Sequence, residues 1–194
     1  MPRIAWIEDA EAQGELASYL AGVRTSTGKP LQDVLRTMTL RPDFLVPMRE
    51  AIRSLNSNEG ALTRAQREMI VSQVAALTRC HYCLVNHTAA LESYGEPYDE
   101  TARSLRAGAL DLALLTPAER LLLEFVDRLT RNAHAITDEQ VQGLRDMGWT
   151  DAQIAETVYV GAVSNMIVRL ADAFGLELPE EQASADFPAV EEGR

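Results

Sequence analysis

The residues best suited to chemistry in this sequence are its two cysteines, which both lie in the segment Cys80-His81-Tyr82-Cys83. His87 follows four residues after the second cysteine. Residues three, four and seven apart share one face of a helix, so this spacing predicts two thiols and an imidazole side by side. Thiolate is the reactive form of cysteine, and a histidine can accept the thiol proton near neutral pH. The pattern therefore predicts nucleophilic or redox thiol chemistry.

The place of the motif in its helix also favours thiolate. We expect a helix over residues 80–94 that opens with the cysteines. Unpaired backbone N–H groups and the positive end of the helix dipole stabilise negative charge in a first turn. A carboxylate on the second ring nitrogen would orient His87 as a base. The sequence therefore predicts a thiol of low pKa.

Other uses of a cysteine pair fit this sequence less well. Structural zinc normally takes four ligands, and the remaining histidines, His81 and His134, are not at zinc-finger spacing, so we expect no metal and no other cofactor. Leu84 follows the second cysteine where covalent c-type haem needs a histidine. A thioredoxin fold would place a strand before the motif, and none is visible. The remaining alternative is that the cysteines and His87 are inert core residues.

Helices must position these residues, because apolar residues recur three and four apart along almost the whole chain. The expected fold class is all-α. Four threonines, Thr63, Thr116, Thr137 and Thr150, each stand three residues before a Glu or Gln, which is the capping-box pattern of a helix start. We expect helices near residues 9–23, 31–39, 42–56, 63–78, 80–94, 98–107, 116–132, 137–147 and 150–174.

Three segments refine this organisation. Residues 154–170 are apolar all around the helix, which predicts burial in the domain centre or between subunits. Residues 62–67 resemble residues 115–120, which indicates either a degenerate internal helical repeat or only the recurrence of similar caps. Acidic residues and prolines beyond residue 176 predict a tail. We therefore expect one helical domain over residues 1–176 and an acidic C-terminal tail over residues 177–194.

Composition excludes several classes of protein. The chain has 194 residues and a formal net charge of −11, and two cysteines are too few for a disulfide-rich scaffold. The acidic balance argues against nucleic acid as a partner. No apolar run without charges approaches the length of a membrane span, so no membrane association is expected. The N-terminal residues lack the features of a secretory signal, which predicts a cytoplasmic protein.

The spacing Glu68-x11-Cys80-x2-Cys83-x3-His87 resembles the signature of the AhpD-like family in the carboxymuconolactone decarboxylase superfamily. Residues 115–130 and 136–160, with Asn165 and Arg169, resemble the subgroup called peroxidase-related enzymes. The likeness covers most of residues 5–176. It implies an AhpD-like helical domain, assembly into homo-trimers or hexamers, and antioxidant, thiol-dependent reduction of hydroperoxides.

The resemblance also implies a role for each residue of the motif. Cys83 corresponds to the peroxidatic cysteine, Cys80 to the resolving cysteine, His87 to the base and Glu68 to the carboxylate that begins a proton relay. On one continuous helix this carboxylate and the histidine would lie roughly 28 Å apart, so the chain must reverse near residues 78–80. An external dithiol, such as a lipoyl-bearing or thioredoxin-like carrier, would then reduce the disulfide.

One position departs from the family pattern. The best-studied branch has a histidine directly before the second cysteine, where this chain has Tyr82, and His81 lies about 100° away around the helix. Tyr82 could donate a hydrogen bond to a peroxide oxygen or could simply pack. Two other functions also stay open: a lyase that acts on a carbon acid through Glu68 and His87, and an oligomeric redox sensor or interaction protein without turnover.

Overall fold

The computed structural model describes residues 2–55, 60–107 and 114–178, and these residues form helices and no strand. This confirms the expected all-α class. The elements are α1 (Gly14–Thr27), α2 (Asp33–Arg36), α3 (Pro42–Leu55), α4 (Arg64–Thr78), α5 (His81–Glu92), α6 (Tyr98–Arg106), α7 (Pro117–Asn132), η2 (Ala133–Ala135), α8 (Asp138–Asp146) and α9 (Asp151–Phe174).

Four helices, α4, α7, α8 and α9, start where the threonine caps predict them. The Thr63 hydroxyl accepts a hydrogen bond from the Gln66 backbone N–H at 3.2 Å, and the Gln66 side chain accepts one from the Thr63 N–H at 2.9 Å. The same reciprocal pair is present at Thr116, Thr137 and Thr150. Each cap satisfies two backbone donors that a helix end would otherwise leave unpaired. The four capping boxes are therefore confirmed.

The N-terminal third differs from the expectation. The helix expected over residues 9–23 begins instead at Gly14 and ends at Thr27, and the helix expected over 31–39 is reduced to the single turn of α2. Ion pairs account for the late start, because Arg36 binds Glu8 and Arg24 binds Asp9, at 2.5 and 2.6 Å. These contacts between distant segments fix residues 8–12 in a turn, which local periodicity does not reveal.

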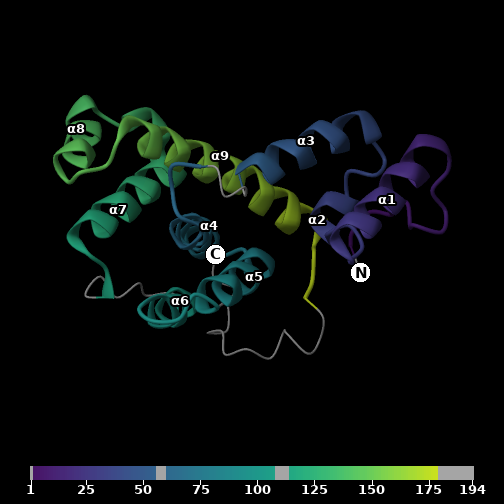
Figure 1. Cartoon of the computed structure of the whole chain (residues 1–194), viewed down its shortest axis with the longest axis horizontal. Coiled ribbons are helices and arrows are strands. Elements are labelled where there is room, and N and C mark those ends of the chain that lie inside the picture. The colour runs from purple at the N-terminus through teal and green to yellow at the C-terminus, as the bar shows by residue number, and fades with distance from the viewer. Residues whose placement is uncertain (1, 56–59, 108–113, 179–194) are drawn as a thin grey trace, which may run out of the picture.

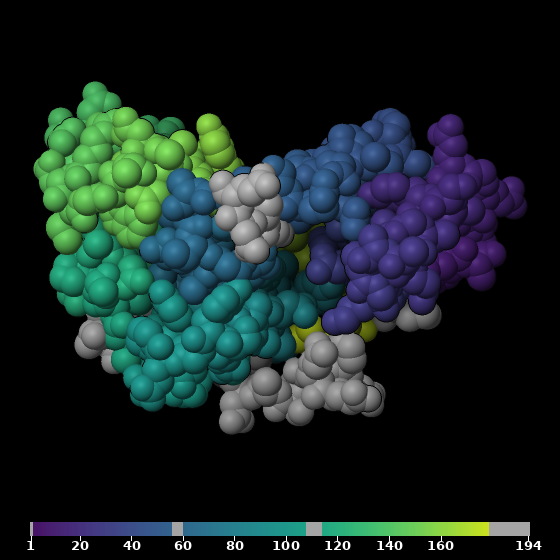
Figure 2. Space-filling view, in the orientation of Figure 1, coloured from purple at the N-terminus to yellow at the C-terminus, as the bar shows by residue number. Residues whose placement is uncertain are grey.

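The centre of the fold is α4, which packs against α5, α6, α7 and α9. Figure 1 shows α4 nearly end-on, with α5 and α6 below it and the long α9 above. On the face seen in Figure 2, α1 to α3 form one side of the molecule and α7 and α8 the opposite side. Nine residues of α4 are buried, including Met69, Ile70 and Val74. A side chain on α4 is therefore held by packing on several sides.

The apolar helix α9 runs through this assembly. By length and composition alone it could cross a membrane, and 44% of its most apolar window is buried inside the chain. It packs against α4 and α7, so one side of the helix lies in the domain centre, but the burial predicted all around the helix is not seen within the described chain. On its outer face Tyr159 is 59% exposed.

A buried ion pair fastens α4 to α9. The Arg67 Nε atom lies 3.2 Å from the Glu156 Oε1 atom, and the two residues are 2% and 8% exposed. Arg67 also donates to the carbonyl oxygens of Leu55 and Leu62, and Glu156 accepts from the Leu62 backbone N–H at 3.1 Å. The pair therefore holds the end of α3 and the start of α4 against α9.

The predicted acidic tail falls almost entirely on residues 179–194, which lie outside the described residues. The division of the chain into a domain over 1–176 and a tail over 177–194 therefore stays a prediction. The internal repeat stays a prediction as well, because matching caps at Thr63 and Thr116 would also arise without duplication.

Candidate active site

The chain reverses between α4 and α5 at Arg79. This residue has a left-handed backbone with φ of 59°. The N–H groups of Arg79 and Cys80 donate to the carbonyl oxygens of Ala76 and Ala75, at 3.2 and 3.0 Å. This is the hydrogen-bond pattern of a Schellman helix end. The reversal predicted near residues 78–80 is therefore confirmed, and it places Cys80 at the N-cap of α5.

The reversal brings Glu68 and His87 into contact. The His87 Nδ1 atom lies 2.7 Å from the Glu68 Oε2 atom, although the residues are 19 apart in sequence. The Glu68 side chain is 3% exposed and the His87 side chain 33% exposed. A carboxylate can only accept, so the bond places the proton on Nδ1 and leaves Nε2 as the basic nitrogen. The contact between a carboxylate and His87 is therefore present, and the role of His87 as a base stays a prediction.

A third residue of this cluster, Arg64, was missed by the sequence reasoning. Its Nη2 atom lies 2.5 Å from Oε1 of Glu68, one helical turn away. An Arg four residues before a Glu is a visible charge pattern that predicts such a pair. Burial raises the pKa of Glu68, but the hydrogen bond from His87 and the charges of His87 and Arg64 outweigh it and lower that pKa below its ordinary value. The carboxylate is therefore ionised.

Both cysteines are buried free thiols, with Cys80 0% and Cys83 3% exposed. The expectation of a low thiol pKa is wrong for Cys80. Its pKa is raised by its hydrogen bond to Cys83, by burial and by the charge of Cys83. Cys83 instead lies within the first turn of α5. Two thiols this close cannot both ionise readily, so Cys80 keeps its proton when Cys83 is a thiolate.

Tyr82 is partly buried and packs against the hydrophobic core. Burial raises its pKa to about 12, and the negative charges of Asp33 and Cys83 add to the rise. The phenol therefore keeps its proton at neutral pH. Its side chain faces α2 as well as the thiol pair, so packing is one of its roles, and a hydrogen bond to a peroxide oxygen stays a prediction.

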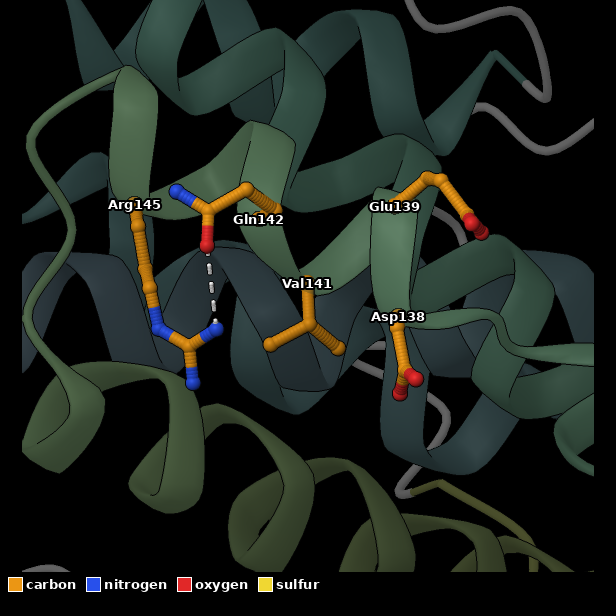
Figure 3. Close-up of a pocket in the computed structure, with 5 residues that line it drawn as sticks. All are labelled: Asp138, Glu139, Val141, Gln142 and Arg145. Atoms are coloured by element: carbon orange, nitrogen blue, oxygen red, sulfur yellow. Dashed lines mark hydrogen bonds between the residues drawn. The ribbon is translucent and has the colours of Figure 1, made fainter.

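A surface hollow lies elsewhere, on α8. Its lining residues are Asp138, Glu139, Val141, Gln142 and Arg145, with the Gln142 side-chain oxygen 3.4 Å from an Arg145 nitrogen (Figure 3). None of the residues singled out from the sequence lines it. Within the described parts of the chain, no cluster of three or more His, Cys, Asp or Glu residues is arranged to hold a metal ion.

Known proteins resemble this chain in sequence over part of its length and in fold over most of it. Residues 42–128, which span α3 to most of α7 and contain the whole site, match the carboxymuconolactone decarboxylase family. The comparison with curated proteins gave no match.

Solved structures resemble the chain over most of its length. A peroxidase-related protein from Ralstonia eutropha JMP134, described as an alkylhydroperoxidase AhpD core, has a TM-score of 0.79 and 24% identity, with 94% of each chain covered. A peroxidase-related protein from Silicibacter sp. TM1040 has a TM-score of 0.75 and 24% identity, with 94% of this chain and 96% of that chain covered.

A protein of unknown function from Agrobacterium tumefaciens, whose description suggests the antioxidant defence protein AhpD, has a TM-score of 0.64 and 19% identity. The match covers 74% of this chain and 95% of that chain. At these identities the likeness establishes the fold. The chain therefore has the AhpD-like fold, and its residues 42–128, which contain the candidate site, are similar to the carboxymuconolactone decarboxylase family.

Proposed function

We propose that this protein is a thiol peroxidase that reduces hydroperoxides with its Cys80–Cys83 pair. The observation that carries the proposal is the 2.7 Å contact between Glu68 of α4 and His87 of α5, which lies one helical turn after Cys83. The family match and the neighbours named as peroxidase-related proteins support the same activity. A base oriented by a buried carboxylate, one helical turn from a thiol, suits the generation of a thiolate nucleophile.

In the first step, His87 accepts the proton of Cys83 through Nε2. The thiolate attacks the terminal oxygen of a hydroperoxide, and the O–O bond breaks. Sulfur is oxidised to a sulfenic acid, and the peroxide is reduced to an alkoxide or hydroxide. The proton on His87 passes to that leaving group, which departs as alcohol or water. Glu68 stabilises the imidazolium while it carries this proton.

In the second step, the Cys80 sulfur attacks the Cys83 sulfenic acid. A disulfide forms and water leaves. The raised pKa of Cys80 keeps it protonated until this step, which supports the assignment of Cys80 as the resolving thiol. Neighbouring positions around one turn of helix lie near the separation that a disulfide needs.

An external dithiol then restores the two thiols by exchange and is itself oxidised to a disulfide. We propose a lipoyl-bearing or thioredoxin-like carrier for this step, because the buried cysteine pair needs a reductant with two thiols. This cycle fits a reducing cytoplasm, where a disulfide of this kind is transient.

The test mixes reduced protein with an alkyl hydroperoxide and follows free thiols and sulfenic acid over time. In Cys80→Ser the sulfenic acid on Cys83 should persist, and in Cys83→Ser peroxide consumption should fall to the background rate. Unchanged free thiols after mixing wild type with peroxide would refute the proposal. A lyase would retain its activity in the double variant Cys80→Ser/Cys83→Ser, and a redox sensor would oxidise once without turnover when dithiol is supplied.

We further propose a homo-oligomer, a trimer or a hexamer. The outer face of α9 supports this, because Tyr159 and Ala162 are exposed on an otherwise apolar helix. Exposed apolar faces on folded proteins commonly mark contacts between chains. Light scattering coupled to size-exclusion chromatography should give three or six times the 21.4 kDa chain mass, and Tyr159→Glu should lower it.

A further inference from the structure

We propose that Arg64 is a positioning residue of the proton relay, which holds one oxygen of Glu68 so that the other is kept for His87. The proposal rests on the proposed thiol chemistry but concerns a residue outside the Glu-Cys-Cys-His motif. The two oxygens of the buried Glu68 carboxylate have different partners, Arg64 and His87.

The geometry makes this division clear. Oε1 of Glu68 lies 2.5 Å from the Arg64 guanidinium and Oε2 lies 2.7 Å from the His87 ring. The Glu68 side chain is only 3% exposed, so water supplies little of its hydrogen bonding. A carboxylate held at one oxygen by a planar guanidinium has a fixed plane and loses rotational freedom. Its second oxygen is thereby held in place for Nδ1 of His87.

Charge adds a second effect. Glu68 is on a helix otherwise lined by buried groups, where an unpaired carboxylate would tend to take up a proton. A protonated Glu68 would no longer stabilise the imidazolium that forms when His87 accepts the thiol proton. The positive charge of Arg64 favours the deprotonated state of the site. Its removal should therefore make proton loss harder, whether the proton is on Glu68, His87 or Cys83. The apparent pKa of thiol reactivity should therefore rise.

Charged groups on the neighbouring elements act on other residues, since the charges that lower the pKa of Glu68 are those of His87 and Arg64. On α9, Glu156 pairs with Arg67, and on α6, Arg106 pairs with Glu92 of α5 at 2.6 Å. Asp172 of α9 and Asp33 of α2 act on Cys80 and Tyr82, respectively. These groups are unchanged when Arg64 is replaced, so a shift in the pH profile reports the Arg64–Glu68 contact.

The experiment measures the rate of Cys83 alkylation by iodoacetamide against pH, in full-length protein with Cys80→Ser so that one thiol reacts. In Arg64→Gln we expect the rate at pH 7 to fall about tenfold and the midpoint of the profile to move up by about one pH unit. Arg64→Lys keeps the charge and should recover most of both. The matched control is Arg131→Gln, which breaks an exposed pair with Asp127 also four residues apart and should change neither.

A double-variant cycle separates positioning from a structural role. In a Glu68→Gln background, Arg64→Gln should change the rate and the midpoint much less than it does alone, since only the direct effect of the Arg64 charge on the thiol remains. An equal further loss in that background would overturn the proposal, as would an unchanged profile in Arg64→Gln alone. If Arg64→Gln fails to fold, the ¹⁵N chemical shifts of His87 in Arg64→Lys provide the test. We expect Nδ1 of His87 to stay protonated in that variant, and loss of this proton would overturn the proposal.

Alkylation needs no peroxide. The role of Arg64 and the proposed peroxidase function can therefore be refuted separately. An Arg64-dependent pH profile without peroxide turnover would refute the proposed function and leave the relay intact. Peroxide turnover with a pH profile that does not depend on Arg64 would support the proposed function and refute the role of Arg64.

Discussion

Replacement of Glu156 with Gln should destabilise the fold strongly without touching the thiol site. Glu156 is 8% exposed, and its carboxylate pairs with Arg67 at 3.2 Å and accepts from the Leu62 N–H at 3.1 Å. The amide of Gln keeps one acceptor oxygen. Its N–H₂ group, however, would face one of the two donors, the Arg67 guanidinium or the Leu62 N–H. It also leaves the Arg67 guanidinium, 2% exposed, without a compensating charge.

The magnitude follows from what is lost. Removal of one partner of a buried ion pair costs about 3–5 kcal/mol, and the oxygen that Gln retains places this variant near 3 kcal/mol. For a chain of 150–250 residues, each kcal/mol shifts the melting temperature by about 2–4 °C. We therefore expect Glu156→Gln to melt about 6–12 °C below wild type.

Calorimetry and urea unfolding at fixed protein concentration measure the change. The exposed pair of Arg131 and Asp127 provides the control, since Asp127→Asn should alter the free energy of unfolding by less than about 1 kcal/mol. A double variant, Arg67→Met/Glu156→Leu, should lose less than the sum of its single changes, because no charge is left buried alone. If Glu156→Gln lowers the free energy of unfolding by less than about 1 kcal/mol, the buried pair contributes little to stability and this reasoning is refuted.

Three further outcomes are expected. Gly60→Ala should destabilise wild type by about 1–3 kcal/mol but Glu156→Ala by less, because an added Cβ at residue 60 would collide with the Glu156 carboxylate, which Ala lacks, and urea unfolding of both backgrounds measures this. Thr63→Ala should cost about 1 kcal/mol in urea unfolding through loss of the α4 cap, with no change in the pH profile of alkylation. The lowered pKa of Glu68 gives stability that is present above its ordinary pKa of 4.5 and is lost as pH falls through the lower folded value, so Glu68→Gln should show a smaller fall in melting temperature than wild type as pH drops below about 4.5.

Local signals in the sequence were sufficient for much of the fold and for part of the site. The threonine caps predicted the starts of α4, α7, α8 and α9, because a capping box is made within four residues. The distance argument for Glu68 predicted the reversal, although an arginine is an unusual residue for the left-handed backbone at position 79.

What the sequence could not supply depends on contacts between distant segments. The late start of α1 reflects ion pairs that join residues 8 and 9 to residues 36 and 24. The raised pKa of Cys80 reflects burial and a neighbouring thiol, and neither is visible in a helix-start pattern. Arg64 was overlooked because an Arg-Glu pair four apart is common on solvated helix surfaces, and its importance here comes from the burial of Glu68.

The burial of both thiols also governs how the protein must be handled. Cys80 and Cys83 are 0% and 3% exposed, whereas the imidazole beside them is one-third exposed. Bulky maleimide or polyethylene glycol labels, added to a native extract to count reduced cysteines, will react at a rate limited by access. Fully reduced protein would then score as oxidised. Samples taken from cells should be denatured in acid before labelling, so that the label count reports oxidation alone.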